Sequence, residues 1–169
     1  MLGGKSKKSS DIERWALGWA LGSYHFDRYK GTKSVKKTKL FVPQSSKLES
    51  IVQSIFLTRD LINTPAEDMG PANLENAARG IAKKYNAKIN IIIGEDLRKK
   101  NYPAIHAVGR AVKTTKQTPR LIDFKWGNTS HPKLTLVGKG VCFDTGGLNI
   151  KTTAGMKLMK KDMGGAAMY

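Results

Sequence analysis

Segments with helical periodicity alternate along this chain with short runs rich in β-branched residues, and this alternation constrains the fold more than any other feature. Candidate helices cover residues 11–24, 46–62, 69–86 and 95–101. Candidate strands cover the residues just before Pro43 and residues 87–94, 104–110, 119–126 and 133–140. Helices and strands in turn usually build layers around one sheet. The pattern therefore predicts an α/β fold, a three-layer mixed sheet flanked by helices.

The composition indicates a globular chain and argues against several protein classes. Of the 169 residues, 40% are hydrophobic, which is enough to build a core. The longest largely apolar run, residues 89–93, is far shorter than the roughly 20 residues of a membrane helix, so no membrane partner is expected. The first residues do not resemble a secretory signal. The single cysteine, Cys142, excludes an internal disulfide and fits a cytoplasmic protein.

A formal net charge of +17 would attract nucleic acids through long-range electrostatics. The lysines are densest at residues 5–8, 30–39 and 157–161. Neither arginine–aromatic interleaving nor zinc-finger spacing nor an RNA-binding motif accompanies them. Solvated lysine faces are the simpler interpretation, and DNA binding is the alternative.

The glycine-rich stretch VGKGVCFDTGGLNIK, residues 137–151, directly follows an apolar run. Ligands commonly bind at the ends of strands in open α/β sheets. A phosphate-binding loop is one interpretation, but neither G-x-x-x-x-G-K-[ST] nor G-x-G-x-x-G occurs there.

Cysteine catalysis is a second interpretation of the same stretch. Cys142 would be the nucleophile, and one of the histidines would be its base; these are His25, His106 and His131. The apolar neighbours of Cys142 favour a buried, inert thiol instead.

A metal site is the third interpretation. From residue 133 onward the only acidic residues are Asp144 and Asp162, in a segment that carries six lysines, and each aspartate precedes a glycine pair. Glycines let the backbone approach closely, and carboxylate oxygens are the ligands of hard divalent cations. On spacing alone, two surface aspartates neutralised by the surrounding lysines are the better explanation of the pattern.

The stretch from Val137 to Ala167, VGKGVCFDTGGLNIKTTAGMKLMKKDMGGAA, closely resembles the leucyl (cytosol) aminopeptidase family. Its members carry V-G-K-G-x-x-F-D-[ST]-G-G-x-x-[IL]-K followed by M-x-x-D-M-[CG]-G-A-A. Residues 59–71 and 104–110 resemble the same family, and the resemblance extends from about Trp15 to the last residue. It implies a hydrolase that removes N-terminal amino acids from peptides with two divalent metal ions, zinc or manganese, and that assembles as a homo-hexamer.

The resemblance also implies roles for single residues. By position, Lys139, Asp144 and Asp162 match metal ligands, with Asp144 bridging both ions. A lysine amine binds a metal only when neutral, and a neighbouring dication supplies the field that lowers its pKa. Lys151 matches the lysine that polarises the scissile carbonyl or stabilises the oxyanion. Met159 matches a methionine that lines the pocket for the first side chain of the substrate, although core packing explains this residue equally well.

The resemblance further implies a domain organisation. Residues 1–43 match a remnant of the family's N-terminal domain, residues 44–62 its connecting helix, and residues 63–169 the N-terminal half of the catalytic domain. The family's N-T-D-A-E-G-R stretch, which supplies an aspartate, a glutamate and an arginine to the site, does not occur in this sequence. We therefore expect a truncated fragment that is inactive alone, poorly soluble and marginally stable, with a non-catalytic remnant as the alternative.

Overall fold

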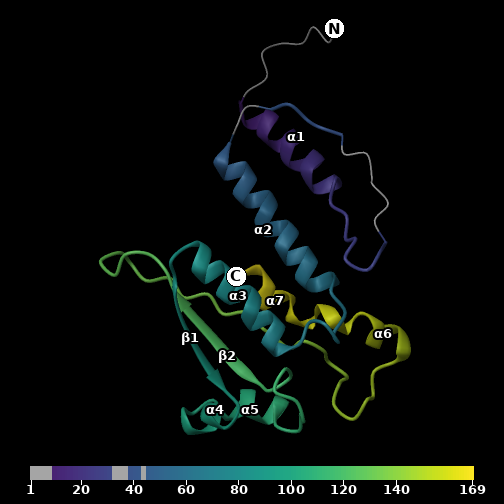
Figure 1. Cartoon of the computed structure of the whole chain (residues 1–169), viewed down its shortest axis with the longest axis vertical. Helices are drawn as coiled ribbons and strands as arrows, with labels where there is room; N and C mark the ends of the chain where they lie inside the picture. Colours follow the sequence, from purple (N-terminus) through teal and green to yellow (C-terminus); the bar gives the residue numbers. More distant parts are fainter. Residues whose placement is uncertain (1–8, 32–37, 43–44) are drawn as a thin grey trace, which may run out of the picture. The chain divides into compact units, whose positions relative to one another are not determined.

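Figure 1 shows the computed structural model of the chain, which describes residues 9–31, 38–42 and 45–169. The chain divides into two compact units, residues 1–60 and 61–169, each with its own internal contacts. The predicted lysine cluster at residues 5–8 and most of the cluster at residues 30–39 lie outside the described residues. None of the helices that the structure describes combines the length and the apolar character that a membrane crossing requires.

The first unit contains α1 (Ser9–Gly22) and most of α2 (Ser46–Asn63). Both helices were predicted from their apolar periodicity, and the structure confirms them with ends that differ by one or two residues. Helix α2 ends at Asn63, two residues before Pro65. A proline disfavours helical geometry in the residue that precedes it.

Tyr24, just after α1, connects this helix to α2 within the first unit. Its hydroxyl donates a hydrogen bond of 2.7 Å to the carboxylate of Asp60, and its ring centroid lies 5.1 Å from that of Phe56. The guanidinium of Arg59 lies over the same ring and donates to the carbonyl of Leu21 at 2.9 Å. A polar and an aromatic contact thus reinforce each other at one end of the helix pair.

The strand predicted just before Pro43 is wrong. Residues 38–42 adopt no regular structure, and Phe41 is 93% exposed. A short apolar run has strand propensity, but a strand also needs a neighbour to pair its N–H and C=O groups. The described residues of this unit provide no such neighbour.

The second unit is built around two antiparallel strands, β1 (Lys88–Ile93) and β2 (Arg120–Lys125). Their register places Lys88 opposite Lys125 and Ile93 opposite Arg120. Within the described ranges these two strands form the whole sheet. Both were predicted as strands, and the α/β class of the fold is confirmed.

Helix α3 lies beside this sheet, and α4 and α5 lie together at one of its ends (Figure 1). Helix α3 (Pro71–Lys84) begins with a proline in its first turn and packs against both strands. Helix α4 (Glu95–Lys99) contacts β1, and α5 (Pro103–Gly109) contacts β2. The predicted helices 69–86 and 95–101 are confirmed, although each is shorter than expected.

The strand predicted at residues 104–110 is wrong, because this segment forms α5. Pro103 occupies the first helical turn, where its fixed φ suits a helix. His106 lies on the buried side of α5, and its Nε2 is 2.8 Å from Oε1 of Glu95 at the start of α4. Contact between two short helices therefore overrides the local pattern of β-branched residues.

The strand predicted at residues 133–140 is also wrong, since these residues form no regular strand. Leu134 is 81% exposed and Val137 is 85% exposed. Alternating apolar residues predict a strand only when a partner strand supplies hydrogen bonds. Neither β1 nor β2 pairs with this segment among the described residues.

The core of the second unit joins elements that are far apart in sequence. Leu61 at the end of α2, Met69, Leu74 on α3 and Met163 form one buried cluster. Residues packed against this cluster are Ile62, Ala77, Ile122, Ala166 and Ala167. The chain after residue 152 forms α6 (Thr153–Lys157), the short 3₁₀ helix η1 (Met159–Met163) and α7 (Gly164–Met168). The cluster therefore fixes η1 and α7 to α2 and α3.

A buried charge cluster complements the apolar core. Glu75 on α3 accepts hydrogen bonds from Arg79, at 2.7 Å, and from Arg120 at the start of β2. Burial alone would raise the pKa of Glu75, but the two guanidinium groups outweigh burial and lower it. Arg120 also donates to the carbonyl groups of Thr118 at 3.1 Å and Thr115 at 2.9 Å, so the cluster ties α3, β2 and the preceding turn together.

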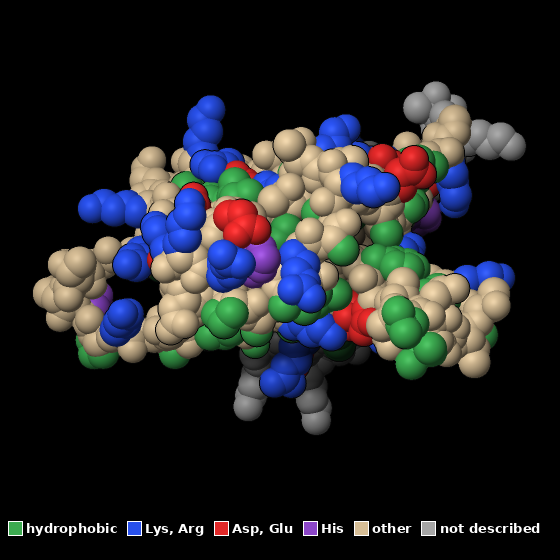
Figure 2. Space-filling view, turned by 90° about the horizontal axis from the view of Figure 1, so that it is seen from below, with side chains coloured by type: hydrophobic (Ala, Val, Ile, Leu, Met, Phe, Trp, Pro, Cys, Tyr) green, Lys and Arg blue, Asp and Glu red, His purple; other side chains and the backbone are tan. Residues whose placement is uncertain are grey.

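Basic side chains are distributed over the surface. On the face shown in Figure 2, Lys and Arg form several separate groups, with acidic and hydrophobic side chains between them. This distribution fits solvated lysine faces better than one continuous binding patch.

We expect Glu75→Gln to lower the free energy of unfolding by about 3 kcal/mol at pH 7, because it leaves Arg120 buried without a charge partner. The folded-state pKa of Glu75 lies below its ordinary value of 4.5. The stabilisation by this carboxylate is therefore complete above the ordinary pKa and is lost as pH falls through the folded-state pKa. Urea unfolding at a series of pH values should show the difference between wild type and variant shrinking below about pH 4.5.

The exposed Glu67 offers the matched control for this measurement. Glu67→Gln should change stability by less than about 0.5 kcal/mol at every pH. A Glu75→Gln protein that unfolds like wild type at pH 7 would contradict the stabilising role of the cluster.

Candidate functional site

The glycine-rich loop brings Lys151 back towards Asp144. Gly146 and Gly147 have φ of +79° and +101°, a conformation that glycine adopts without strain. The N–H of Gly146 donates to Oδ1 of Asp144 at 2.7 Å, and the N–H of Lys151 donates to the carbonyl of Thr145 at 3.3 Å. The loop therefore closes on itself and presents both charged side chains on one side.

Asp144 and Lys151 form an ion pair. Nζ of Lys151 lies 2.9 Å from Oδ2 of Asp144, and both side chains are about one-third exposed or less. The hydrogen bond from Lys151, assisted by the N–H of Gly146, lowers the pKa of Asp144. The same ammonium group is 2.9 Å from the sulfur of Met159. Lys151 and Met159, for which the family resemblance implies substrate contacts, therefore lie side by side.

Lys139 and Asp162 form a second ion pair, with Nζ of Lys139 2.8 Å from Oδ2 of Asp162. The close carboxylate of Asp162 raises the pKa of Lys139, and the charge of Asp144 adds to this effect. Oδ2 of Asp162 is buried, and among the described residues no group donates to it with the geometry of a hydrogen bond. A buried carboxylate oxygen that faces an amine, with a second carboxylate close by, is a suitable environment for a cation.

Close backbone packing holds Lys139 beside Asp162. The N–H of Ala166 on α7 donates to the carbonyl of Lys139 at 2.9 Å. A Cβ atom at Gly138 would lie 2.6 Å from the Cα of Ala166, and one at Gly165 would lie 3.0 Å from the nitrogen of Lys139. Glycines at both positions let the two segments approach, so they determine the position of the lysine.

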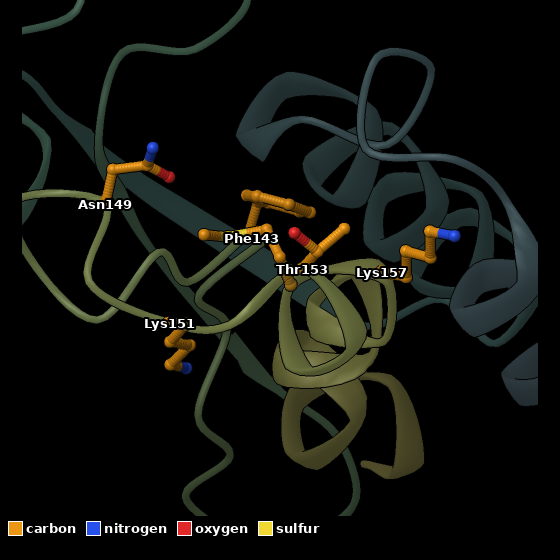
Figure 3. Close-up of a pocket in the computed structure, with 6 residues that line it drawn as sticks. Phe143, Asn149, Lys151, Thr153 and Lys157 are labelled. Atoms are coloured by element: carbon orange, nitrogen blue, oxygen red, sulfur yellow. The ribbon is translucent and has the colours of Figure 1, made fainter.

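An open cleft of about 370 Å³ is lined in part by Lys151, the partner of Asp144. Figure 3 shows that Lys151 and Asn149 come from the glycine-rich loop, whereas Thr153 and Lys157 come from α6. The lining residues are Phe143, Asn149, Lys151, Thr153, Met156 and Lys157. With two lysines, an amide and a hydroxyl in its wall, the cleft can donate hydrogen bonds to carbonyl or carboxylate oxygens of a ligand.

The structure therefore places the five predicted site residues in two groups: Lys151 with Asp144 and Met159, and Lys139 with Asp162. Within the ranges that the structure describes, no three His, Cys, Asp or Glu side chains form a metal cluster. Sequence reasoning missed the cleft residues Asn149, Thr153 and Lys157. Asn149 has a positive φ of 59°, a conformation that asparagine adopts more readily than most residues. An asparagine shortly after a glycine pair could therefore have predicted this turn from the sequence.

The structure argues against cysteine catalysis. Burial raises the pKa of the Cys142 thiol to about 11, so the thiol stays protonated at neutral pH. His106, one of the three candidate bases, contacts Glu95 instead.

Comparison with known proteins places these residues in a family context. The profile described as cytosol aminopeptidase family, catalytic domain, matches residues 56–169. The solved structure of the cytosol aminopeptidase from Coxiella burnetii is 53% identical, with a TM-score of 0.85 over 93% of this chain and 34% of that one. Peptidase B of Photorhabdus laumondii is 39% identical over 165 residues, which are 92% of this chain and 37% of that protein.

A third similar protein was solved with a metal. The structure described as the bottromycin maturation enzyme BotP in complex with Mn is 29% identical, with a TM-score of 0.79 over 99% of this chain and 36% of that one. The chain spans about a third of the length of the curated relatives it matches.

We expect Gly138→Ala to lower the free energy of unfolding by about 2 kcal/mol or more, because the new methyl group meets backbone atoms of α7 that cannot rotate away. Urea unfolding measures this loss. Gly80→Ala is the matched control, since no atom lies within 4 Å of the added Cβ and alanine favours the α3 helix by up to about 1 kcal/mol. A Gly138→Ala protein as stable as wild type would show that the close approach is not required.

Proposed function

Because this chain belongs to the cytosol aminopeptidase family, we propose that it forms part of a cytoplasmic metallo-aminopeptidase that releases N-terminal amino acids from peptides. One observation carries the proposal. Two aspartates and two lysines from the family-matched region form two ion pairs, and Lys151 of one pair lines an open cleft. Peptide hydrolysis needs such a combination of anionic ligands for cations and a cationic donor for the carbonyl oxygen.

The proposed cofactors are two divalent ions, manganese or zinc. Lys139, Asp144 and Asp162 would hold them, with Asp144 shared between both. The buried Oδ2 of Asp162, which faces Nζ of Lys139 at 2.8 Å, supports this assignment, as does the charge of Asp144 acting on Lys139. When bound, the ions would acidify a water molecule and polarise the peptide carbonyl.

Lys139 and Lys151 would have different roles in the loaded site. Nζ of Lys139 faces Asp162 and must lose its proton before it can donate a lone pair. Nζ of Lys151 would keep its proton. With Asp144 bound to a cation instead, this ammonium group, which lines the cleft, would be available to donate to the oxygen of the scissile carbonyl.

Met159 would border the space for the first side chain of the substrate. Its sulfur touches the ammonium group of Lys151, so a side chain that packs on Met159 would have its carbonyl close to Lys151. The unbranched thioether adapts to side chains of different shapes, which suits a leucine-type preference without strict selection.

The organisation of the whole protein is part of the same proposal. Residues 1–43 would belong to an N-terminal domain, residues 44–62 to a connecting helix and residues 63–169 to the catalytic domain. The resemblance supports a homo-hexameric assembly. DNA binding by the +17 chain is the competing proposal, and steep loss of DNA binding with rising salt is its signature.

We expect the 169-residue chain alone to show no turnover of leucine-p-nitroanilide with added manganese, because its sequence contains no N-T-D-A-E-G-R stretch. Turnover should appear when the chain is co-expressed with the segment of a family member that carries that stretch. In this reconstituted enzyme, Lys151→Met should lower kcat by roughly 100-fold to 1,000-fold, as loss of an oxyanion donor does.

The exposed Lys161 supplies the matched control, because Lys161→Met removes the same charge nearby and should leave kcat unchanged. Rapid turnover by the 169-residue chain alone would refute the need for a second half-site. Reconstituted enzyme that is equally active with Lys151→Met would refute the role of Lys151.

A further inference from the structure

The short helix η1 (Met159–Met163) presents two different faces to its surroundings. In a 3₁₀ helix, side chains three residues apart project in the same direction. Met159 and Asp162 therefore share one face, and Lys160 and Met163 share another. Lys161 lies on the remaining side and is exposed.

The first face of η1 points to the candidate site. The sulfur of Met159 lies 2.9 Å from Nζ of Lys151, and Oδ2 of Asp162 lies 2.8 Å from Nζ of Lys139. Both contacts depend on how η1 is rotated about its own axis. A turn of this short helix by one residue would move Asp162 away from Lys139.

The second face of η1 contacts the end of α2. Met163 is completely buried and packs with Leu61. Nζ of Lys160 donates to the backbone carbonyl of Asn63, the last residue of α2, at 2.8 Å. Asn63 and η1 belong to the same compact unit, residues 61–169.

The contact of Lys160 has a clear electrostatic reason. The last carbonyl groups of a helix lack partners within the helix, and the helix dipole makes this end negative. The last turn of α2 contains no basic residue of its own. Lys160, 97 positions further along the chain, supplies the missing cation.

We propose that Lys160 is a positioning residue for the candidate metal centre: by capping the C-terminus of α2 it fixes the rotation of η1, so that Asp162 faces Lys139 and Met159 faces Lys151. This inference rests on the proposed function for the identity of the site. The contact with α2 itself rests only on the structure. Met163 anchors one end of η1 through apolar packing, which has little direction, whereas Lys160 adds a directed hydrogen bond.

The experiment compares three variants of the 169-residue chain. Lys160→Met removes the ammonium group and keeps an apolar stem, Lys160→Arg restores a cationic donor, and Lys161→Met removes a neighbouring exposed charge. Electron paramagnetic resonance of free Mn²⁺ measures metal affinity. Hydrogen exchange, followed by mass spectrometry over peptides that contain residues 158–163, measures the ordering of η1 without metal. Circular dichroism confirms that each variant is folded.

We expect Lys160→Met to weaken Mn²⁺ binding about tenfold, as loss of a group that orients a ligand does. Exchange in residues 158–163 should accelerate at least about fivefold, because the end of η1 loses a charge-assisted hydrogen bond. Lys160→Arg should recover both properties, and Lys161→Met should match wild type in both.

The outcomes separate this inference from the proposed function. Wild-type chain that binds no Mn²⁺ would weaken the proposed metal site, and the exchange data would then decide the role of Lys160 alone. If Lys160→Met leaves both affinity and exchange unchanged, Lys160 is not a positioning residue. If Lys161→Met produces the same changes as Lys160→Met, the effect comes from net charge and the inference also fails.

Discussion

Met163 has no exposed surface, and its side chain packs with Leu61, Met69 and Leu74 in the core of the second unit. Because Met163 directly follows Asp162, this packing brings a carboxylate to the edge of the core without burying it completely. Truncating such a buried methionine to alanine costs about 2 to 5 kcal/mol, so the segment from η1 to α7 is held strongly. The closely packed glycines of residues 138 and 165 then bring Lys139 to this fixed carboxylate.

The site is locally neutral in a chain of net charge +17. Each aspartate of the site faces one lysine, at 2.8 Å and 2.9 Å. These partly exposed pairs contribute little to stability, because solvent screens them. Their importance is that they hold two carboxylates in place. The buried pair of Glu75 and Arg120, which the more exposed Arg79 joins, has the opposite character, since we expect it to stabilise the fold and none of its members lines the cleft.

Local patterns in the sequence predicted α2, α3, β1 and β2 because each has strong periodicity or propensity of its own. Residues 104–110 and 133–140 were mispredicted because their structure depends on partners: His106 meets Glu95 in a helix pair, and no strand pairs with Leu134 among the described residues. The ordered motif around Lys139 and Asp144 led to the candidate site residues, and their roles stay a prediction. The motif did not reveal that each lysine would neutralise a specific aspartate. The partners are 7 positions apart in one pair and 23 in the other, so the pairing depends on how the glycine-rich loop and α7 fold.

The two ion pairs of the site determine which contacts would have to change before a cation binds. The carboxylates of Asp144 and Asp162 already have lysine partners, so a divalent cation held by them would replace those partners. Lys139 would then have to lose a proton and Lys151 would have to leave Asp144, while the backbone that carries the aspartates stayed fixed. The ammonium group of Lys160 donates to the end of α2 instead, so Lys160 would take no part in this exchange. A site in which two lysines moved and Lys160 held η1 in place would change its charge partners without losing its geometry.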